Sequence, residues 1–382
     1  MMESNESRML PLTERMLARM ALDQATLGPV RIILVQHLLY DTEEFIRLVR
    51  GFGFEILKVV GIEYSARQDV VERLTSCGLD VVVPHFADME VVLRELFSTE
   101  LAGNESKRVV LQEVGGYCAN LLDGFVRIPF EGKFVGIIEE TKQGLWRYRA
   151  LPVVPVPVIE IADSFLKGLE ARYVGEAVAR AVEVDLLETG STLWGARAVV
   201  FGFGDIGSAV ANSLRVRGGS VSCFDPDSLK LIDARLRGFR SPRRQELLSN
   251  ADVIVGASGE RSLMDEDLQQ LADGVMLASA SSKDVEFPMD LIHRVARKRR
   301  QLTSFVNEYL MPWGTRIRVA SEGYPINFRG FSLPHFMSDI LFAQIVAAMN
   351  LLLSARTSNG IHSLTEETQI DIASEWLDVY QH

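Results

Sequence analysis

The sequence has few cysteines and no excess of positive charge. Its 382 residues include three cysteines, Cys77, Cys118 and Cys223, which lie far apart and show no metal-ligand spacing. This usage is typical of proteins in a reducing compartment, so a cytoplasmic location is expected. The formal net charge is −11. Because binding to a phosphate backbone requires clustered lysine and arginine, we expect no nucleic-acid partner.

Long apolar runs are also missing. The first 16 residues lack the apolar core of a signal peptide. The longest apolar stretch, residues 340–353, is interrupted by Gln344 and Asn350 and is too short to span a bilayer. It therefore predicts a buried helix and no membrane partner. No His/Cys/Asp cluster has the spacing of a metal site, and no G-x-S-x-G motif suggests covalent catalysis.

What the first 150 residues do contain is a repeated alternation of short β-branched runs with segments of helical periodicity. Such alternation predicts a parallel sheet covered by helices on both faces, which is a doubly wound α/β domain. The predicted strands are residues 30–37, 54–62, 79–86, 108–114 and 133–139.

A second alternation of the same kind begins near residue 194, after a long predicted helix that ends at Gly190. Residues 151–164 contain three prolines, which predicts an edge strand or an extended connector. The chain is therefore predicted to hold two Rossmann-like α/β domains, with C-terminal helices that return to the first. The expected divisions are 1–184 for a substrate domain, 185–332 for a dinucleotide-binding domain and 333–382 for the returning helices.

Residues 198–207, AVVFGFGDIG, carry a G-x-G-x-x-G motif between a predicted strand and a predicted helix. Gly202 allows the tight turn, Gly204 lets the backbone approach a pyrophosphate, and Gly207 permits close packing of the helix. The N-terminus of that helix favours an anion. The next predicted strand ends on Asp225, whose carboxylate suits ribose hydroxyls and repels a 2′-phosphate. These features predict NAD as the cofactor.

Four stretches of the chain resemble the S-adenosylhomocysteine hydrolase family, in order and spacing, over residues 30–355. They are AVVFGFGDIGSAVANSLRVRG, GIIEETKQGLWRYRA, VPVIEIADS and the late segment RIRVASEGYPINFRGFSLPHFMSDILFAQIVAAMNLL. The resemblance implies tightly bound NAD and a cycle that oxidises a ribose hydroxyl, eliminates a thiol, adds water and reduces the sugar again.

The resemblance also implies roles for particular residues. It places His37, Glu113, Glu140 and Lys167 at the family's catalytic positions, with Lys167 as general base. The cofactor contacts it implies are Gly202, Gly204, Asp205, Ile206, Gly207, Asp225, Thr141, Ser258 and Asp339. It further implies a homo-oligomer, a dimer or a tetramer.

Several family positions have changed in this chain. Ala171 and Arg172 replace an Asp/Asn pair, Ser282 replaces one histidine, and Ser332 or Leu333 replaces another, with His335 displaced by two residues. Each general acid or base contributes about 10²–10⁴ in rate, so ordinary hydrolase activity is not expected. We therefore predict an NAD-binding homologue that acts on another hydroxylated, nucleoside-like small molecule, in the cleft between the domains. The alternatives are a catalytically silent NAD-binding regulator or oligomer partner and, more weakly, a 2-hydroxyacid dehydrogenase.

Overall fold

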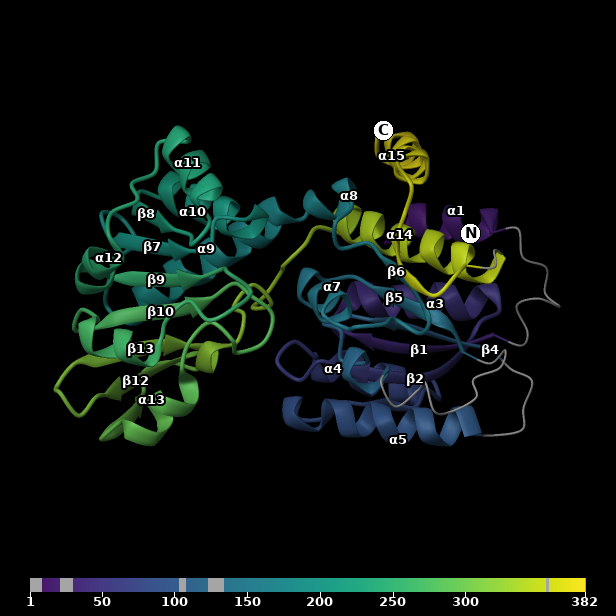
Figure 1. Cartoon of the computed structure of the whole chain (residues 1–382), viewed down its shortest axis with the longest axis horizontal. Helices are drawn as coiled ribbons and strands as arrows, with labels where there is room; N and C mark the ends of the chain where they lie inside the picture. The colour runs from purple at the N-terminus through teal and green to yellow at the C-terminus, as the bar shows by residue number, and fades with distance from the viewer. Residues whose placement is uncertain (1–8, 21–29, 103–107, 123–133, 355–356, 382) are drawn as a thin grey trace, which may run out of the picture. The chain divides into compact units, whose positions relative to one another are not determined.

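The computed structural model describes residues 9–20, 30–102, 108–122, 134–354 and 357–381, and it consists of two compact units (Figure 1). Unit 1 is made of two chain segments, Met1–Leu169 and Pro334–His382, and unit 2 is the segment Glu170–Leu333 between them. Each unit is built on one seven-stranded sheet flanked by helices. The predicted α/β class with two Rossmann-like sheets is confirmed.

The sheet of unit 1 is parallel throughout, with the strand order β14-β6-β5-β4-β1-β2-β3. Each of the five strand segments predicted from β-branched runs contains a strand, although the third is reduced to two residues. The strands are β1 (Val30–Gln36), β2 (Glu55–Gly61), β3 (Val81–Val82), β4 (Arg108–Glu113), β5 (Phe134–Glu139), β6 (Pro157–Glu160) and β14 (Gly360–Ser363).

The proline-rich stretch supplies β6, which is not an edge strand. β14 pairs on its outer side in parallel register, with Gly360 opposite Pro157. Proline is tolerated there because it is the first residue of the strand, and the backbone N–H of Gly360 donates to the preceding carbonyl, that of Val156, at 3.1 Å. A strand that enters the sheet from a segment 200 residues later could not be foreseen from the local pattern.

Helix α14 (His335–Ser354) is the core helix of unit 1. It packs on β5 and β6, and it lies on the opposite face of the sheet from α5 (Met89–Ala102) in Figure 1. It is long and apolar enough to pass as a membrane span, but 83% of its most apolar window is buried inside the protein. The other helices of unit 1 are α1 (Pro11–Arg19), α3 (Tyr40–Phe52), α4 (Gln68–Ser76), α7 (Lys142–Arg149), α8 (Phe165–Gly168) and α15 (Glu366–Tyr380).

The sheet of unit 2 has the order β11-β12-β13-β10-β9-β7-β8, and only the β11/β12 and β12/β13 pairs are antiparallel. Its strands are β7 (Arg197–Phe201), β8 (Ser220–Phe224), β9 (Val253–Gly256), β10 (Val275–Ser279), β11 (Lys298–Gln301), β12 (Val306–Leu310) and β13 (Arg316–Ala320). Its helices are α9 (Ala171–Glu188), α10 (Asp205–Val216), α11 (Ser228–Leu236), α12 (Arg244–Asn250) and α13 (Met289–Val295).

The long helix expected before Gly190 is divided into α8 and α9, and α9 belongs to unit 2. The division between the units therefore falls before Glu170, whereas the sequence places it after residue 184. The reason is the close packing of α9 on α10, where a Cβ atom on Gly175 would come within 2.6 Å of the Ala209 backbone. A glycine at that point lets the two helix backbones approach each other.

Candidate functional site

The glycine loop between β7 and α10 has the tight geometry predicted for it. Gly202 has φ +95°, and its N–H donates to the Phe224 carbonyl at 2.8 Å. A Cβ atom on Gly202 would lie 2.5 Å from the Ala257 carbonyl oxygen, and one on Gly207 would lie 2.0 Å from the Gly202 carbonyl oxygen. Both positions therefore exclude any side chain, since real Cβ contacts are not so short.

Gly204 differs from Gly202 and Gly207, the other two glycines of the motif, because the position that its Cβ would occupy is open. No heavy atom lies within 4 Å of that position, and the backbone, with φ −79°, is open to any residue. Gly204 is the N-cap of α10, so the first amides of that helix and the positive end of its dipole lie beside this open space. The fold itself does not require a glycine here, and access for an anion at this position stays a prediction.

Asp225 follows directly after β8 and is 3% exposed. Its carboxylate accepts hydrogen bonds from the Phe203 amide at 2.7 Å and the Asp227 amide at 2.9 Å. These contacts fasten the carboxylate to the glycine loop. Lys230 lies 3.7 Å away and places a cation beside this carboxylate.

The carboxyl edge of the unit 1 sheet, where its parallel strands end, carries a row of buried acids. The last residues of β4, β5 and β6 are Glu113, Glu139 and Glu160, and they lie in register with one another. None is more than 2% exposed. Because burial disfavours the charged form of a carboxyl group, each of these acids requires donors or a proton.

Glu140, one of the predicted catalytic residues, lies one position beyond β5 and is 5% exposed. Its Oε1 accepts hydrogen bonds from the side-chain amides of Gln36, at 2.5 Å, and Gln112. The other end of Gln36 accepts from the His37 backbone amide at 2.8 Å. Gln36 therefore links Glu140 to His37, so two of the four predicted catalytic residues are parts of one network.

Glu113, also predicted as catalytic, is buried within the unit. Its carboxyl group accepts from the Tyr148 hydroxyl and, at 3.2 Å, from the Cys118 amide. Burial, followed by the nearby charge of Glu139, raises the pKa of Glu113 well above its usual range. A carboxyl with no exposed surface and these partners orders the loop after β4, and a direct catalytic role for it stays a prediction.

His37 lies directly after β1 and its Nδ1 is 2.6 Å from the Ser65 hydroxyl oxygen. Because the Ser65 hydroxyl has the Ile62 carbonyl as an acceptor at 3.1 Å, both bonds are satisfied when Nδ1 carries the proton. Nε2 then holds the lone pair. Burial, followed by the positive charge of Lys167, lowers the pKa of His37 from 6.5 to about 3. The structure thus brings Lys167, on α8, within electrostatic reach of a histidine that is neutral at physiological pH.

We expect His37 to stay neutral as the solution is acidified to about pH 4, and its ring NMR signals to report this directly. Since its folded-state pKa is below the unfolded value of 6.5, the stability it contributes is complete above pH 6.5 and is lost as pH falls toward about 3. A His37→Gln variant should therefore lose less stability than the wild type over that range. The control is His85→Gln, at a histidine whose side chain is 82% exposed. Equal acid sensitivity in wild type and His37→Gln would contradict the prediction.

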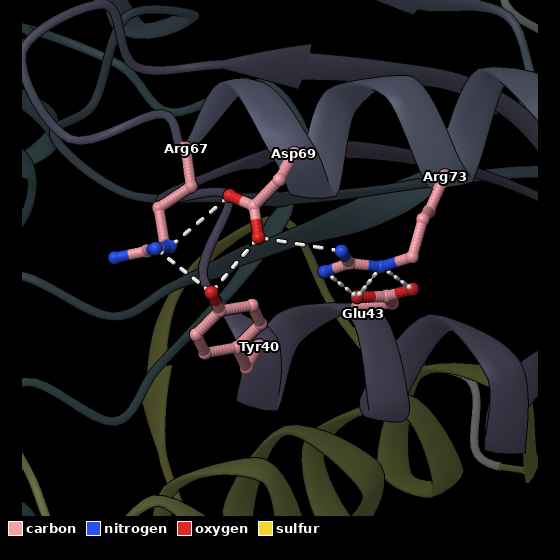
Figure 2. Close-up of polar contacts among 5 residues, drawn as sticks. All are labelled: Tyr40, Glu43, Arg67, Asp69 and Arg73. Carbon is pink, nitrogen blue, oxygen red and sulfur yellow. Dashed lines mark hydrogen bonds and ion pairs between the residues drawn. The ribbon is translucent and has the colours of Figure 1, made fainter.

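An exposed polar cluster joins the beginnings of α3 and α4, as Figure 2 shows. The Tyr40 hydroxyl donates to Asp69 at 2.8 Å and accepts from Arg67 at 2.8 Å. Arg73 binds Glu43 at 2.7 Å and Asp69 at 3.3 Å. The Tyr40 hydroxyl, more than any other contact, holds the pKa of Asp69 below its usual value. Exposed pairs contribute little individually, but this cluster ties together the two loops that carry the histidine–serine pair.

A second pairing at the same edge involves His335, at the first position of α14. Its Nδ1 lies 2.6 Å from Asp41 Oδ1, and the Ser338 hydroxyl donates to the other oxygen of the same carboxylate. The sequence marks His335 as displaced from its family position. The structure shows that it nevertheless has a carboxylate partner on α3, the helix that follows His37.

The remaining predicted cofactor contacts lie in different places. Asp205 and Ile206 begin α10, the former exposed and the latter packed against the core. Thr141 is the N-cap of α7 in unit 1, and its hydroxyl accepts from the Gly144 amide at 3.1 Å. Ser258 follows β9 in unit 2. Their contacts with a cofactor stay predictions.

Asp339, on α14 of unit 1, is fully buried. Its carboxylate accepts from the amides of Leu12 and Thr13, both at 2.8 Å, from the Thr13 hydroxyl at 2.6 Å and from the Tyr380 hydroxyl at 2.7 Å. These bonds tie α1 and α15 to α14. The structure therefore gives Asp339 a role in the folding of unit 1, and its contact with a cofactor stays a prediction.

Some buried polar residues of these networks were not anticipated. Four of them share a position at or next to the end of a parallel strand, which is the signal that could have found them: Gln36, Gln112, Glu139 and Glu160. The fifth, Glu286, lies on the loop after β10, and no such signal marks it. Within the described part of the chain, no group of three or more His, Cys, Asp or Glu residues could hold a metal ion.

Comparison with known proteins gives these sites a context. Residues 177–331 match the family model of the S-adenosyl-L-homocysteine hydrolase NAD-binding domain. An adenosylhomocysteinase from Archaeoglobus fulgidus is 26% identical over 324 residues, covering 81% of this chain and 78% of the relative. An S-inosyl-L-homocysteine hydrolase from Methanothermobacter thermautotrophicus is 26% identical over 267 residues, covering 68% and 61%. A solved phosphoglycerate oxidoreductase from Vibrio cholerae has a TM-score of 0.45 at 15% identity, covering 85% of this chain and 99% of its own, and nothing about function follows from it.

The glycine loop, Asp225 and the matched NAD-binding domain define an NAD-binding protein with two α/β units. More particularly, unit 2 matches the NAD-binding domain of S-adenosyl-L-homocysteine hydrolases, and the chain is 26–28% identical to adenosylhomocysteinases over most of its length. NAD is its cofactor, and unit 2 has the residues that fit it. Gly204 would hold the pyrophosphate and Asp225 the ribose hydroxyls, and both contacts stay predictions.

Proposed function

We propose that the chain is an NAD-dependent enzyme that carries out a redox or redox-initiated elimination step on a hydroxylated, nucleoside-like small molecule. The observation that supports this proposal most is the network at the carboxyl edge of unit 1. It joins a neutral histidine to a buried carboxylate, and a lysine lies within electrostatic reach of that histidine; these are the groups that a sugar oxidation needs.

Each of these residues has a chemical task in the proposed reaction. Lys167 takes the proton of the hydroxyl that is oxidised, and the lone pair on His37 Nε2 accepts a hydrogen bond or a proton from the sugar. Glu140, held by two glutamine amides, accepts hydrogen bonds from a diol. Bound NAD supplies the hydride acceptor. The displaced and replaced histidines are the reason for proposing a substrate other than S-adenosylhomocysteine.

The test is to incubate the purified protein, with NAD bound, with adenosine, with inosine and with their homocysteine thioethers, and to follow NADH absorbance and release of free thiol. We expect NADH to form with a nucleoside-type compound. A Lys167→Met variant should reduce the rate about 100-fold or more, because a general base is lost. The matched control is Lys298→Met, at an exposed lysine on β11 of unit 2.

Two outcomes would contradict the proposal. If no compound of this class reduces the bound NAD, the chain is a silent NAD-binding homologue. If NADH forms and Lys167→Met forms it as fast as the wild type, Lys167 has no part in the mechanism.

A further inference from the structure

Glu286 is a buried acid of unit 2 with no assigned role. It lies on the loop that follows β10 and has no exposed surface. A Cβ atom on Gly256, the last residue of β9, would come within 2.7 Å of the Glu286 Cβ atom. Glu286 is therefore packed directly against the end of the neighbouring strand, at the carboxyl edge of the NAD-binding sheet.

The carboxylate of Glu286 collects five hydrogen bonds from the loops after β9 and β10. Its Oε1 accepts from the amides of Ser258 and Gly259, both at 2.8 Å, and from the Ser281 hydroxyl. Its Oε2 accepts from the Ser258 hydroxyl, at 2.8 Å, and from the Ser262 hydroxyl. Burial raises the pKa of Glu286, and these donors counter that shift. A carboxylate with this many donors fixes both loops in one conformation.

The loop after β10 also has a constrained backbone. Lys283, between Ser281 and Glu286, is 1% exposed and has φ +69°, a left-handed conformation that non-glycine residues rarely adopt. Such a conformation persists only where the surroundings over-determine it, and it is common at ligand sites. Ser281 and Glu286, which are joined by one of these hydrogen bonds, flank Lys283 in the chain.

The loop that Glu286 holds is next to the glycine loop. The Ala257 carbonyl, one residue before Ser258, is the group that a side chain on Gly202 would strike. The strand order β10-β9-β7-β8 places Glu286 on one side of the glycine loop and Asp225 on the other. In sheets of this kind a dinucleotide lies across the carboxyl edge, with its adenosine toward the acidic residue after the second strand.

We propose that Glu286 is a positioning residue for the nicotinamide–ribose half of NAD. It acts through the loops after β9 and β10, whose shape it sets, and not by touching the adenosine half. The amide and hydroxyl donors of Ser258 are already used by Glu286, so Ser258 serves the cofactor through the loop conformation. This inference rests on NAD as the cofactor and not on the proposed redox reaction.

The test compares the affinities of NAD and ADP in a Glu286→Gln variant, since ADP shares adenosine and pyrophosphate with NAD and lacks nicotinamide ribose. Glutamine keeps the shape but places an N–H group against backbone N–H and hydroxyl donors. We expect NAD affinity to fall about tenfold, equivalent to one lost charged hydrogen bond, and ADP affinity to change less than twofold. Asp225→Asn, the matched control, should lower the affinities for NAD and for ADP by the same factor.

If Glu286→Gln does not fold, Ser281→Ala and Ser262→Ala each remove one donor without adding another, and the same split between NAD and ADP is expected. An equal loss of affinity for NAD and ADP, or no loss of affinity for either, would overturn the proposal. Absence of NAD binding in the wild type would overturn it as well. If the wild type binds NAD and no nucleoside reduces that NAD, the proposed enzymatic function is contradicted and the proposal for Glu286 is not. The two tests can therefore be distinguished.

Discussion

Replacing Gly204 with alanine is expected to leave the fold intact and to lower NAD affinity about 10–100-fold. The added Cβ meets no heavy atom within 4 Å in the protein, and the backbone angles at this position suit alanine. The loss arises only when the pyrophosphate approaches the α10 N-terminus, since a methyl group placed in an occupied space costs about 1–3 kcal/mol.

The measurement is isothermal titration with NAD, accompanied by thermal unfolding of the ligand-free protein. Gly51→Ala provides the matched control, because Gly51 also has nothing within 4 Å of its Cβ position and lies on α3 of unit 1. Gly207→Ala should behave differently and unfold more easily without ligand, since its Cβ would meet the Gly202 carbonyl. Unchanged NAD affinity in Gly204→Ala would show that the pyrophosphate does not pass this glycine.

Replacing Glu139 with glutamine is expected to lower the free energy of unfolding by about 2–4 kcal/mol, whereas Glu113→Gln should change it by less than about 1 kcal/mol. Glu139 accepts from the amides of Gly115, Gly116 and Thr141 and from the Thr141 hydroxyl, at 2.6–3.1 Å. Backbone amides cannot reverse their direction, so the side-chain N–H₂ of glutamine would face them. Chemical denaturation of both variants measures the difference.

The two variants are expected to differ in stability because the main partner of Glu113 is a hydroxyl, whereas the partners of Glu139 are mostly backbone amides. The Tyr148 hydroxyl can rotate and accept a bond from a protonated Glu113 or from glutamine, and the Cys118 amide still finds an oxygen. The folded-state pKa of Glu113 is raised from 4.5 to about 8, so the folded protein keeps a proton that the unfolded chain has lost. The wild type therefore loses stability as the pH rises from about 4.5 to about 8. Glu113→Gln should therefore be more stable than wild type in alkaline solution. Equal losses in the two variants at neutral pH would contradict this assignment.

The fold was largely predictable because its strongest signals are local. Parallel strands covered on both faces are continuous apolar runs, and these predicted four strands of unit 1 closely and the third as a longer element. The position of β6 was not predictable, because its outer neighbour β14 is contributed by residues 360–363. The assignment of α9 to unit 2 depends likewise on its packing against α10, which the amphipathic pattern does not reveal.

The candidate sites divide in the same way. The glycine loop and Asp225 form a motif with a fixed spacing, so residue type and order were enough to predict the geometry of the loop, while its contacts with NAD stay predictions. The functions of Glu139 and Glu286 depend on donors from neighbouring loops, such as Gly116 and Ser258. Asp339 is a different case. The family resemblance implies that it contacts the cofactor, whereas in the structure its carboxylate accepts hydrogen bonds from the N-terminus of α1.

Unit 1 is assembled from two segments that flank unit 2 in the chain, and this fixes the order in which the two can be completed during synthesis. All the strands of unit 2 leave the ribosome before α14 and β14 do. The NAD-binding sheet can therefore fold while the other sheet still lacks its core helix and one edge strand. A nascent chain would be able to bind NAD through unit 2 before unit 1 is complete. The incomplete sheet of unit 1 would then be the part that needs a chaperone.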